Sequence, residues 1–191
     1  MRRLLLILML LPACAWPNAD STEETENLQL LYIASLPAPL PTVDFVDPAR
    51  YAGVWYEIAS IPQFFSQNCT CTTATYGVLA SDLISVYNTC RLGSASGTLN
   101  EIAGVAYVSP ATGNSILNVQ FVPAFRAPYW IIALADDYSY AMVGDPYRGS
   151  LFILARGRTL ADATYNALLQ QATALGFDVS RVRLTAQTGC P

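Results

Sequence analysis

Short runs in which hydrophobic and polar residues alternate make up most of the chain after Val43. The run over 115–122 is one example, with Leu117, Val119 and Phe121 on one face. Alternation puts every second side chain on the same side of a β-strand. Turn residues separate the runs at a spacing of about ten residues, which favours a sandwich or a barrel. The expected strands are an opening strand through Trp55, followed by 71–78, 83–90, 99–108, 115–122, 129–135, 138–143 and 151–156.

One helix is expected, and it follows all of these strands. Thr159 and Asp162 resemble a capping box at its start, and Gly176 resembles a C-terminal stop. The apolar residues between them keep roughly one face, so the helix should lie against the outside of the sheet. A last short strand is expected within 177–185.

The chain begins with the features of an export signal. Two arginines precede an apolar run over 4–11, and small residues lead to Cys14. The ending resembles a bacterial lipobox, in which the cysteine becomes the acylated N-terminus. The alternative is ordinary signal cleavage after Ala15. The first interpretation predicts a lipid-anchored protein of the cell outer membrane, and the second predicts a periplasmic or secreted protein.

Three segments are therefore expected along the chain. A signal peptide over 1–14 precedes a tether over 15–42, which is acidic, then proline-containing, and has no steady hydrophobic period. The folded domain follows over 43–191 and is long enough to bury a sizeable core.

The composition excludes several kinds of chemistry. All ten cationic residues are arginines, so the chain has neither lysine nor histidine. Without histidine there is no Ser-His-Asp triad and no imidazole ligand for a metal, and without lysine there is no Schiff base. The formal charge of −4 argues against nucleic acid as a partner. No cofactor, no metal site and no catalytic residues are expected.

Three short motifs give the chain a resemblance to the lipocalin family. Gly53-Val-Trp55 matches the family's first motif, Gly-x-Trp. Ala135-Asp-Asp-Tyr138 resembles the second, Thr-Asp-Tyr, and Ile153-Leu-Ala-Arg156 resembles the third. The resemblance extends over 45–190 and implies an all-β fold, an eight-stranded antiparallel up-and-down β-barrel with one C-terminal helix packed outside. It also implies that Arg156 packs over Trp55 and closes one end of the barrel.

Within the family, the chain looks most like the branch of the bacterial outer-membrane lipocalin, apolipoprotein D and the plant temperature-induced and chloroplastic lipocalins. The phrases Tyr129-Trp-Ile-Ile-Ala-Leu and Gly176-Phe-Asp-Val-Ser are similar to that branch. The implied function is the binding, storage or transport of a small hydrophobic ligand, such as a fatty acid or lysophospholipid, at the bacterial cell envelope. A monomer or a homodimer is expected, held at the membrane by a lipid on Cys14.

The resemblance also implies residues for the ligand pocket. It places Tyr76 and Phe152 at pocket positions, and Phe64 belongs to the loop expected at the barrel entrance. Strand alternation adds four further candidates, any of which a single β-bulge would turn outward: Ala74, Asn88, Trp130 and Tyr140. The alternative interpretation is that these side chains simply fill a packed interior.

Four cysteines remain in the folded domain when Cys14 is set aside. An even number in an exported chain favours two disulfides. The resemblance implies a bond between Cys71 and Cys190, which leaves Cys69 with Cys90. The alternative pairs Cys71 with Cys90 and Cys69 with Cys190, and it fits a hairpin equally well.

Two other classes of function stay open. One is a structural or stress-protective envelope lipoprotein, whose anchor and surface matter more than its interior. The other is a lipocalin-type enzyme, which is disfavoured because every cysteine of the domain is expected in a disulfide. On the opening strand, Glu57 is the only carboxylate expected to point inward.

Overall fold

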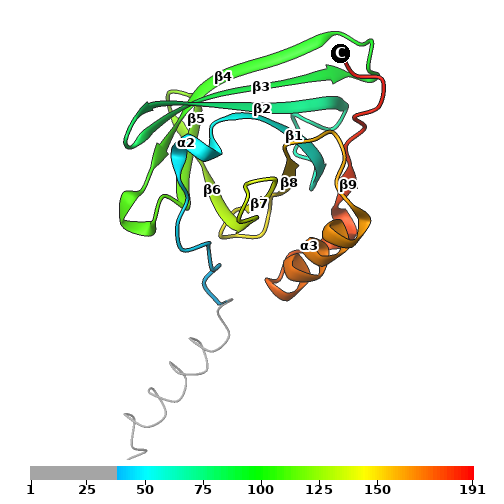
Figure 1. Cartoon of the computed structure of the whole chain (residues 1–191). Coiled ribbons are helices and arrows are strands. Elements are labelled where there is room, and N and C mark those ends of the chain that lie inside the picture. The colour runs from blue at the N-terminus through cyan, green and yellow to red at the C-terminus, as the bar shows by residue number, and fades with distance from the viewer. Residues whose placement is uncertain (1–37) are drawn as a thin grey trace, which may run out of the picture. The chain divides into compact units, whose positions relative to one another are not determined.

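The computed structural model describes residues 38–191 of the chain. The expected signal peptide, Cys14 and all but the last residues of the expected tether lie outside the described part. Within it, eight antiparallel strands form a closed barrel, one short strand adds to the outside, and one helix lies against the wall (Figure 1). This architecture confirms the predicted fold.

Each barrel strand pairs with its neighbours in sequence, and β1 pairs with both β2 and β8 to close the ring. Successive hairpin turns of such a barrel lie at alternate ends. The strands are β1 Gly53–Ser60, β2 Cys69–Ala80, β3 Leu83–Leu92, β4 Leu99–Val108, β5 Ile116–Val122, β6 Phe125–Leu134, β7 Tyr140–Gly144, β8 Leu151–Ala155 and β9 Arg183–Leu184. Two short 3-10 helices cover Pro110–Thr112 and Val179–Arg181.

Strand β6 begins earlier than the sequence predicts. The segment 123–128 is bounded by two prolines, which indicate a loop. In the structure only Pro123 and Ala124 form the turn, and Val122 pairs with Phe125 at the start of β6. Pro128 lies within the strand opposite Asn118. A turn of two residues therefore replaces the expected loop.

The strands separate two hydrophobic clusters. The inner cluster fills the barrel and includes Trp55, Tyr76 and Val119. The outer cluster lies between the barrel wall and the helix α3 Asp162–Ala174, which contributes Leu168 and Ala172. Because α3 covers one side of the wall, strands there bury both faces.

The helix begins later than the predicted capping box. Its N-cap is Ala161, which offers no side-chain hydrogen bond to the first turn. The C-terminal end of the helix agrees with the prediction, since Gly176 follows the last turn with a φ of 87°. Glycine adopts such a left-handed conformation without strain.

The last residues of the expected tether pack on the barrel. Leu40 is buried in the outer cluster. The Ser115 hydroxyl donates to the Thr42 hydroxyl at 2.9 Å, and the Val43 amide donates to the Ile131 carbonyl at 3.0 Å. The packed part of the chain thus begins a few residues before the expected boundary at Val43.

The C-terminal segment lies in the seam where β1 and β2 diverge. Strand β9 pairs with Ala59 and Ser60 of β1, beyond the point where β2 leaves it. The Cys71 amide of β2 then donates to the Ala186 carbonyl at 2.8 Å. The segment therefore bridges two strands that no longer contact each other directly.

Two disulfides fix this arrangement. Cys71 is bonded to Cys190, with the Cα atoms 5.6 Å apart, and Cys69 is bonded to Cys90, with the Cα atoms 5.4 Å apart. This is the pairing that the family resemblance implies, and the alternative pairing is not formed.

Candidate functional site

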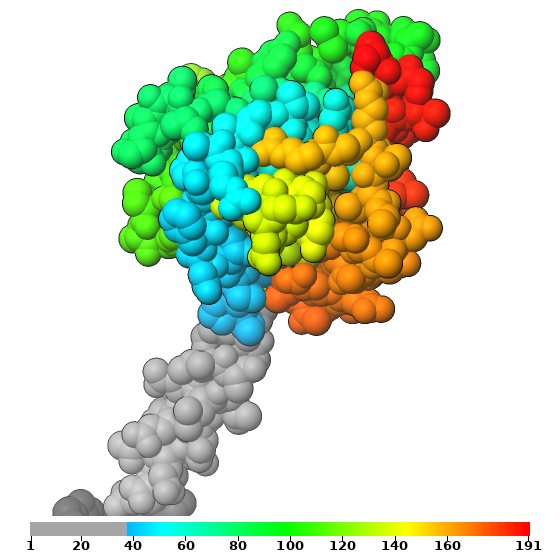
Figure 2. Space-filling view, viewed as in Figure 1, coloured from blue at the N-terminus to red at the C-terminus, as the bar shows by residue number. Residues whose placement is uncertain are grey.

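One end of the barrel is closed by a stack of three side chains. The short helix α2 Pro48–Tyr51 lies across this end, and Tyr51 contacts Trp55 with the ring centroids 4.8 Å apart. The Trp55 indole is fully buried, and its N–H donates to the Tyr51 carbonyl at 2.8 Å. The Arg156 guanidinium lies over the Trp55 ring, 3.9 Å from its centroid. We call this the closed end, and Figure 2 shows the segments around α2 packed against their neighbours there.

Arg156 holds the closed end through its hydrogen bonds as well as its stacking. Its guanidinium donates to the carbonyls of Arg50 at 2.6 Å, Ala52 at 2.9 Å and Val54 at 2.9 Å. Gly53 sits within this group with a φ of 94°, and a Cβ there would lie 3.4 Å from the guanidinium. Glycine is therefore favoured by the conformation, because a φ of this sign strains any residue with a Cβ.

Tyr138 of the second motif positions α2. The Asp47 amide donates to the Tyr138 hydroxyl at 2.8 Å, and the Asp47 carboxylate in turn caps the first turn of α2. The Arg50 guanidinium lies 4.0 Å from the Tyr138 ring. All three motifs thus meet at the closed end.

Three tyrosines form a buried chain of hydroxyl groups inside the barrel. The Tyr129 hydroxyl lies 2.8 Å from that of Tyr51 and 3.0 Å from that of Tyr76. Burial raises the pKa of Tyr76 to about 12 and raises the pKa values of Tyr51 and Tyr129 well above the ordinary range. All three phenols therefore stay neutral at physiological pH.

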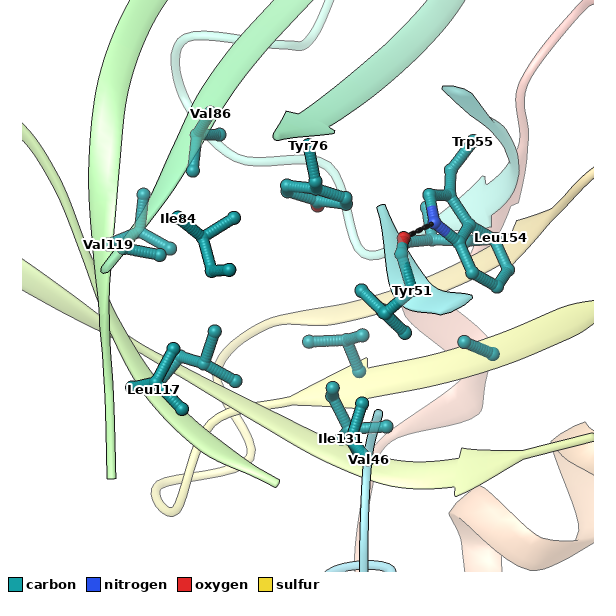
Figure 3. Close-up of a cluster of buried hydrophobic side chains, with 14 of the residues drawn as sticks. Val46, Tyr51, Trp55, Tyr76, Ile84, Val86, Leu117, Val119, Ile131 and Leu154 are labelled. Atoms are coloured by element: carbon teal, nitrogen blue, oxygen red, sulfur yellow. Dashed lines mark hydrogen bonds between the residues drawn. The ribbon is translucent and has the colours of Figure 1, made fainter. Parts of the chain in front are cut away.

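A small cavity lies beside these tyrosines. Its volume of about 20 Å³ is enough for one water molecule. Figure 3 shows the surrounding side chains converging from opposite strands on this space. The cavity is lined by Val46, Pro48, Tyr51, Ala52, Tyr76, Ile84, Ala106, Val108, Asn114, Leu117, Val119, Tyr129 and Ile131. Aliphatic and aromatic groups predominate, as in sites for hydrophobic guests.

The inner face is more accessible toward the opposite end, which we call the open end. Trp55 pairs with Ala74, Ala74 with Asn88, and Asn88 with Ile102, so these four side chains share the inner face across four strands. Trp55 is buried, Ala74 and Asn88 are partly exposed, and Ile102 is 45% exposed. The interior thus becomes more open with distance from the indole.

Glu57 is a buried carboxyl on the inner face. It pairs with Leu154 of β8, a member of the inner cluster. One carboxyl oxygen accepts hydrogen bonds from the Ser60 hydroxyl at 3.1 Å and the Thr185 hydroxyl at 2.5 Å. Burial raises the pKa of Glu57, and these two hydrogen bonds oppose part of that effect.

Four of the candidate pocket residues lie on the inner face. Tyr76 belongs to the inner cluster, and Ala74 and Phe152 pack against it. Asn88 shares their face through its pairing with Ala74. These positions are the ones expected, whereas their contact with a ligand stays a prediction.

Trp130 and Tyr140 lie on the outer face instead, which corrects the expectation for both. Each packs against the outer cluster under α3. In β6 the inward residues are Tyr129 and Ile131, and a bulge between Ile131 and Ala133 shifts the alternation beyond them. Tyr138 sits in a turn with a φ of 62°, so the alternation of β7 starts anew after it and turns Tyr140 outward.

Phe64 lies in the loop between β1 and β2, at the open end. It is 87% exposed and contacts Phe65 edge to face, with the ring centroids 5.2 Å apart. The placement agrees with an entrance loop, and a contact between Phe64 and a ligand stays a prediction.

Sequence reasoning missed Tyr51 and Tyr129 as interior residues. Tyr51 precedes the first strand and lies in a helical turn, where alternation gives no signal. Tyr129 belongs to a run whose faces were assigned the wrong way round, since Trp130 was expected inside. The one available signal was the spacing of Tyr129 and Ile131, which follows ordinary strand alternation.

The part of the chain that the structure describes offers no group of three or more His, Cys, Asp or Glu side chains suited to a metal. Over the same residues, no helix is both long enough and apolar enough to cross a bilayer.

Comparison with protein families identifies a match over most of this barrel. A family model described as a lipocalin-like domain matches residues 46–187. Temperature-induced lipocalin-1 of Arabidopsis thaliana is 35% identical, over 74% of this chain and 80% of that protein. The outer membrane lipoprotein Blc of Escherichia coli strain K12 is 34% identical, over 84% and 92% respectively. Apolipoprotein D of Mus musculus is 34% identical, over 87% and 90%.

Solved structures show the same fold at lower identity. Insecticyanin of the tobacco hornworm Manduca sexta superposes with a TM-score of 0.63 at 22% identity, covering 81% of this chain and 89% of that one. Lobster apocrustacyanin A1 superposes with a TM-score of 0.61 at 22% identity, covering 82% and 96%. At these identities the likeness concerns the fold alone.

Proposed function

The chain belongs to the lipocalin family, and from that premise we propose that it binds a small hydrophobic molecule inside its barrel and carries out no chemistry on it. Members of this family generally bind small hydrophobic ligands. All four cysteines of the domain are in disulfides, so none is available as a nucleophile.

The observation that carries this proposal is the gradient of exposure along the inner face. Trp55 is sealed at the closed end, whereas Ile102, on the same face, is 45% exposed. An inward apolar side chain that stays exposed is a surface that a guest can cover. The cavity beside Tyr51 holds only about one water molecule. A guest therefore occupies the open half of the barrel first, and a long chain reaches deeper only if inner side chains rotate.

We place the ligand among amphiphiles with one acyl chain, such as fatty acids and lysophospholipids. A single chain suits the width of an eight-stranded barrel. The apolar side chains around the cavity, such as Ile84 and Val119, suit the tail of such a molecule.

We further propose that the protein is exported and held at the cell outer membrane by a lipid on Cys14. The support is the lipobox-like sequence and the similarity to outer membrane lipoprotein Blc. The chain between Cys14 and Pro39 would then act as the tether. Mass spectrometry of the N-terminal peptide tests this, because acylation of Cys14 gives a defined added mass that ordinary cleavage after Ala15 does not.

Native mass spectrometry of the domain purified from its own envelope tests the binding function. We expect a bound mass that releases an acyl lipid on activation. A barrel that emerges empty, and that binds neither fatty acid nor lysophospholipid at micromolar concentration, would remove the proposal and favour the structural lipoprotein.

A pair of substitutions on one strand locates the site. Ala74→Trp puts an indole on the inner face and should lower the affinity for an acyl lipid about ten-fold or more, because the ring takes the place of the guest. Thr75→Trp puts the same group on the outer face of the next position and serves as the control. Equal affinities in the two variants would place the ligand elsewhere.

A further inference from the structure

Three buried side-chain oxygens lack a hydrogen-bond partner within residues 38–191, and two of them lie on the neighbouring strands β2 and β3. The three are Thr72 Oγ1, Asn88 Oδ1 and Gln187 Oε1. Buried polar atoms are nearly always paired, and each unpaired one costs free energy. The two oxygens on β2 and β3 indicate a site for a partner that carries hydrogen-bond donors.

The orientation of the Gln187 amide is fixed by its other contacts. Its nitrogen donates to the carbonyls of Glu57 and Thr72, both at 2.9 Å. If the amide nitrogen and oxygen were exchanged, the amide oxygen would face these two carbonyl oxygens, and no hydrogen bond could form. The unpaired oxygen of Gln187, whose side chain is only 7% exposed, is therefore an acceptor.

Strand register puts Thr72 and Glu57 one step from Trp55 toward the open end, and puts Asn88 level with Trp55 on the far side of β2. Ala74 pairs with both Trp55 and Asn88. Thr72 precedes Ala74 by two residues and Glu57 follows Trp55 by two, so alternation puts both on the inner face. We call Glu57, Thr72 and Asn88 the acceptor group. Gln187 lines a pocket on the outer face with Tyr56 and Thr73, so it is not counted in the group.

Among the described residues, the arginines nearest in the fold lie on the outer face or are engaged elsewhere. Arg91 and Arg158 line a pocket on the outer face together with Thr73. Arg156 is engaged in the closed end, with its guanidinium donating to three carbonyls. Arg126 stacks on Tyr107 at 3.8 Å, and Arg91 donates to the Gly97 carbonyl. Tyr56 pairs with Thr73, so the carboxyl of Glu57 lies beside Thr72 on the inner face. A free carboxylate placed here would be buried beside acceptors, while these arginines lie on the outer face or are engaged elsewhere.

We propose that the acceptor group binds the uncharged, hydroxyl-bearing head of an acyl lipid, as in a monoacylglycerol, and discriminates against a free fatty acid. This inference rests on the proposed binding function and narrows its ligand class. The hydroxyl groups donate to the unpaired oxygens, while the acyl chain covers the apolar inner face.

The test compares two probes that share one acyl chain, monolaurin and laurate. Binding to the wild-type domain is measured by displacement of a fluorescent apolar probe at neutral pH. We expect monolaurin to bind about ten-fold more tightly than laurate, the equivalent of one or two hydrogen bonds. Equal affinities, or a preference for laurate, would overturn the inference.

Thr72→Val removes one acceptor and keeps the shape of the side chain. We expect the affinity for monolaurin to fall about three- to ten-fold, since one hydrogen bond to the ligand is lost. The affinity for laurate should change by less than about two-fold, since laurate does not use that bond. Thr75→Val, on the outer face of the same strand, is the matched control and should leave both affinities unchanged. A Thr72→Val variant that weakens both probes equally would show that Thr72 acts on packing alone.

A second pair of substitutions, on β3 and β5, tests the same inference without changing β2. Asn88→Leu removes an inward acceptor on β3, and Asn118→Leu makes the same change on the outer face of β5. Loss of selectivity is expected only for Asn88→Leu. If the wild type binds neither monolaurin nor laurate and does not take up the fluorescent probe, the binding function itself fails. If it binds both alike, only the acceptor group fails.

Discussion

Arg156 joins three backbone carbonyls and one aromatic ring at the closed end. Its guanidinium is planar and carries donors in several directions, so it can stack on Trp55 and donate to Arg50, Ala52 and Val54 at the same time. A lysine ammonium cannot do both, because it is a single point of charge. The residue type is therefore as important here as the charge.

Arg156→Lys tests this dependence. We expect a loss of about 2–3 kcal/mol in the free energy of unfolding, because at least one carbonyl loses a charged donor and the stacking is weakened. Urea denaturation of the two proteins measures it. Arg126→Lys is the control, since Arg126 also stacks on a tyrosine, Tyr107, but on the exposed outer face. Equal losses in both variants would contradict a special role for Arg156.

Glu57→Gln should change how stability depends on pH. Burial raises the pKa of Glu57, so the folded state binds the proton more tightly than the unfolded state does. The contribution of this group is therefore favourable below the unfolded pKa, and stability falls as pH rises through the folded pKa. Glutamine keeps an oxygen for the Ser60 and Thr185 hydroxyls without the charge. It should be more stable than the wild type at neutral pH, by about 1.4 kcal/mol for each unit by which the pKa is raised.

Denaturation midpoints measured from about pH 4 to about pH 8 test the sign. The gap between Glu57→Gln and the wild type should widen as the pH rises. Glu101→Gln, at an exposed site on β4, is the comparison. A gap that stays constant or narrows would show that the Glu57 carboxyl is not penalised by burial.

At the scale of elements, helix α3 lacks a cap. Ala161 occupies the N-cap position and has no side chain that can accept from the first turn. The first backbone N–H groups therefore rely on other partners. The helix still forms because Leu168 and Ala172 pack against the barrel wall.

Ala161→Ser should stabilise the protein by about 0.5–1 kcal/mol, since a serine hydroxyl at the N-cap accepts from the first turn. Thermal unfolding followed by circular dichroism measures the change. Ala163→Ser, two residues later on an exposed helical position, should be neutral or slightly destabilising because serine is a weaker helix former. The prediction fails if both serines have the same effect.

The sequence was sufficient for the order of the strands, the barrel and the closed end. Alternation and turn residues define eight strands, and the motif around Trp55 indicates where the barrel closes. The inner positions of Ala74 and Asn88 followed from the same alternation, because β2 and β3 are regular over that stretch.

Sequence reasoning failed where backbone geometry departs from simple alternation. Alternation counted back from Leu134 across the bulge between Ile131 and Ala133 puts Trp130 on the wrong side, and the left-handed turn at Tyr138 does the same for Tyr140. The contribution of Gln187 had no signal in the sequence, since it depends on a C-terminal segment that reaches the β1–β2 seam. Contacts between residues so far apart in the chain follow from the closed fold and not from local pattern.

On the scale of the whole molecule, two disulfides differ in how much chain they enclose. The Cys71–Cys190 bond joins residues 119 apart, and the Cys69–Cys90 bond joins residues 21 apart. Longer loops lose more entropy on closure, so the two bonds should contribute about 5 and about 3 kcal/mol respectively.

Replacing each pair by serines tests this order. The Cys71→Ser, Cys190→Ser double variant should lose more stability than the Cys69→Ser, Cys90→Ser variant, both because of the longer loop and because the C-terminal segment is released from the seam. Urea denaturation without reductant gives the comparison. A larger loss for the Cys69–Cys90 pair would show that local packing outweighs chain entropy.

The position of the C-terminal segment also sets the order in which the molecule can form. Strand β1 emerges early in synthesis, yet one of its edges waits for β8. The other edge pairs with β2 only at its start, and the rest of it waits for residues 183–187. Until then every nascent chain carries an unpaired strand edge, which is open to intermolecular pairing. Pairing over such sequence distances is slow compared with local hairpin formation. A chain shortened before Arg183 would therefore keep that edge exposed permanently, and a chaperone that shields strand edges would help it most.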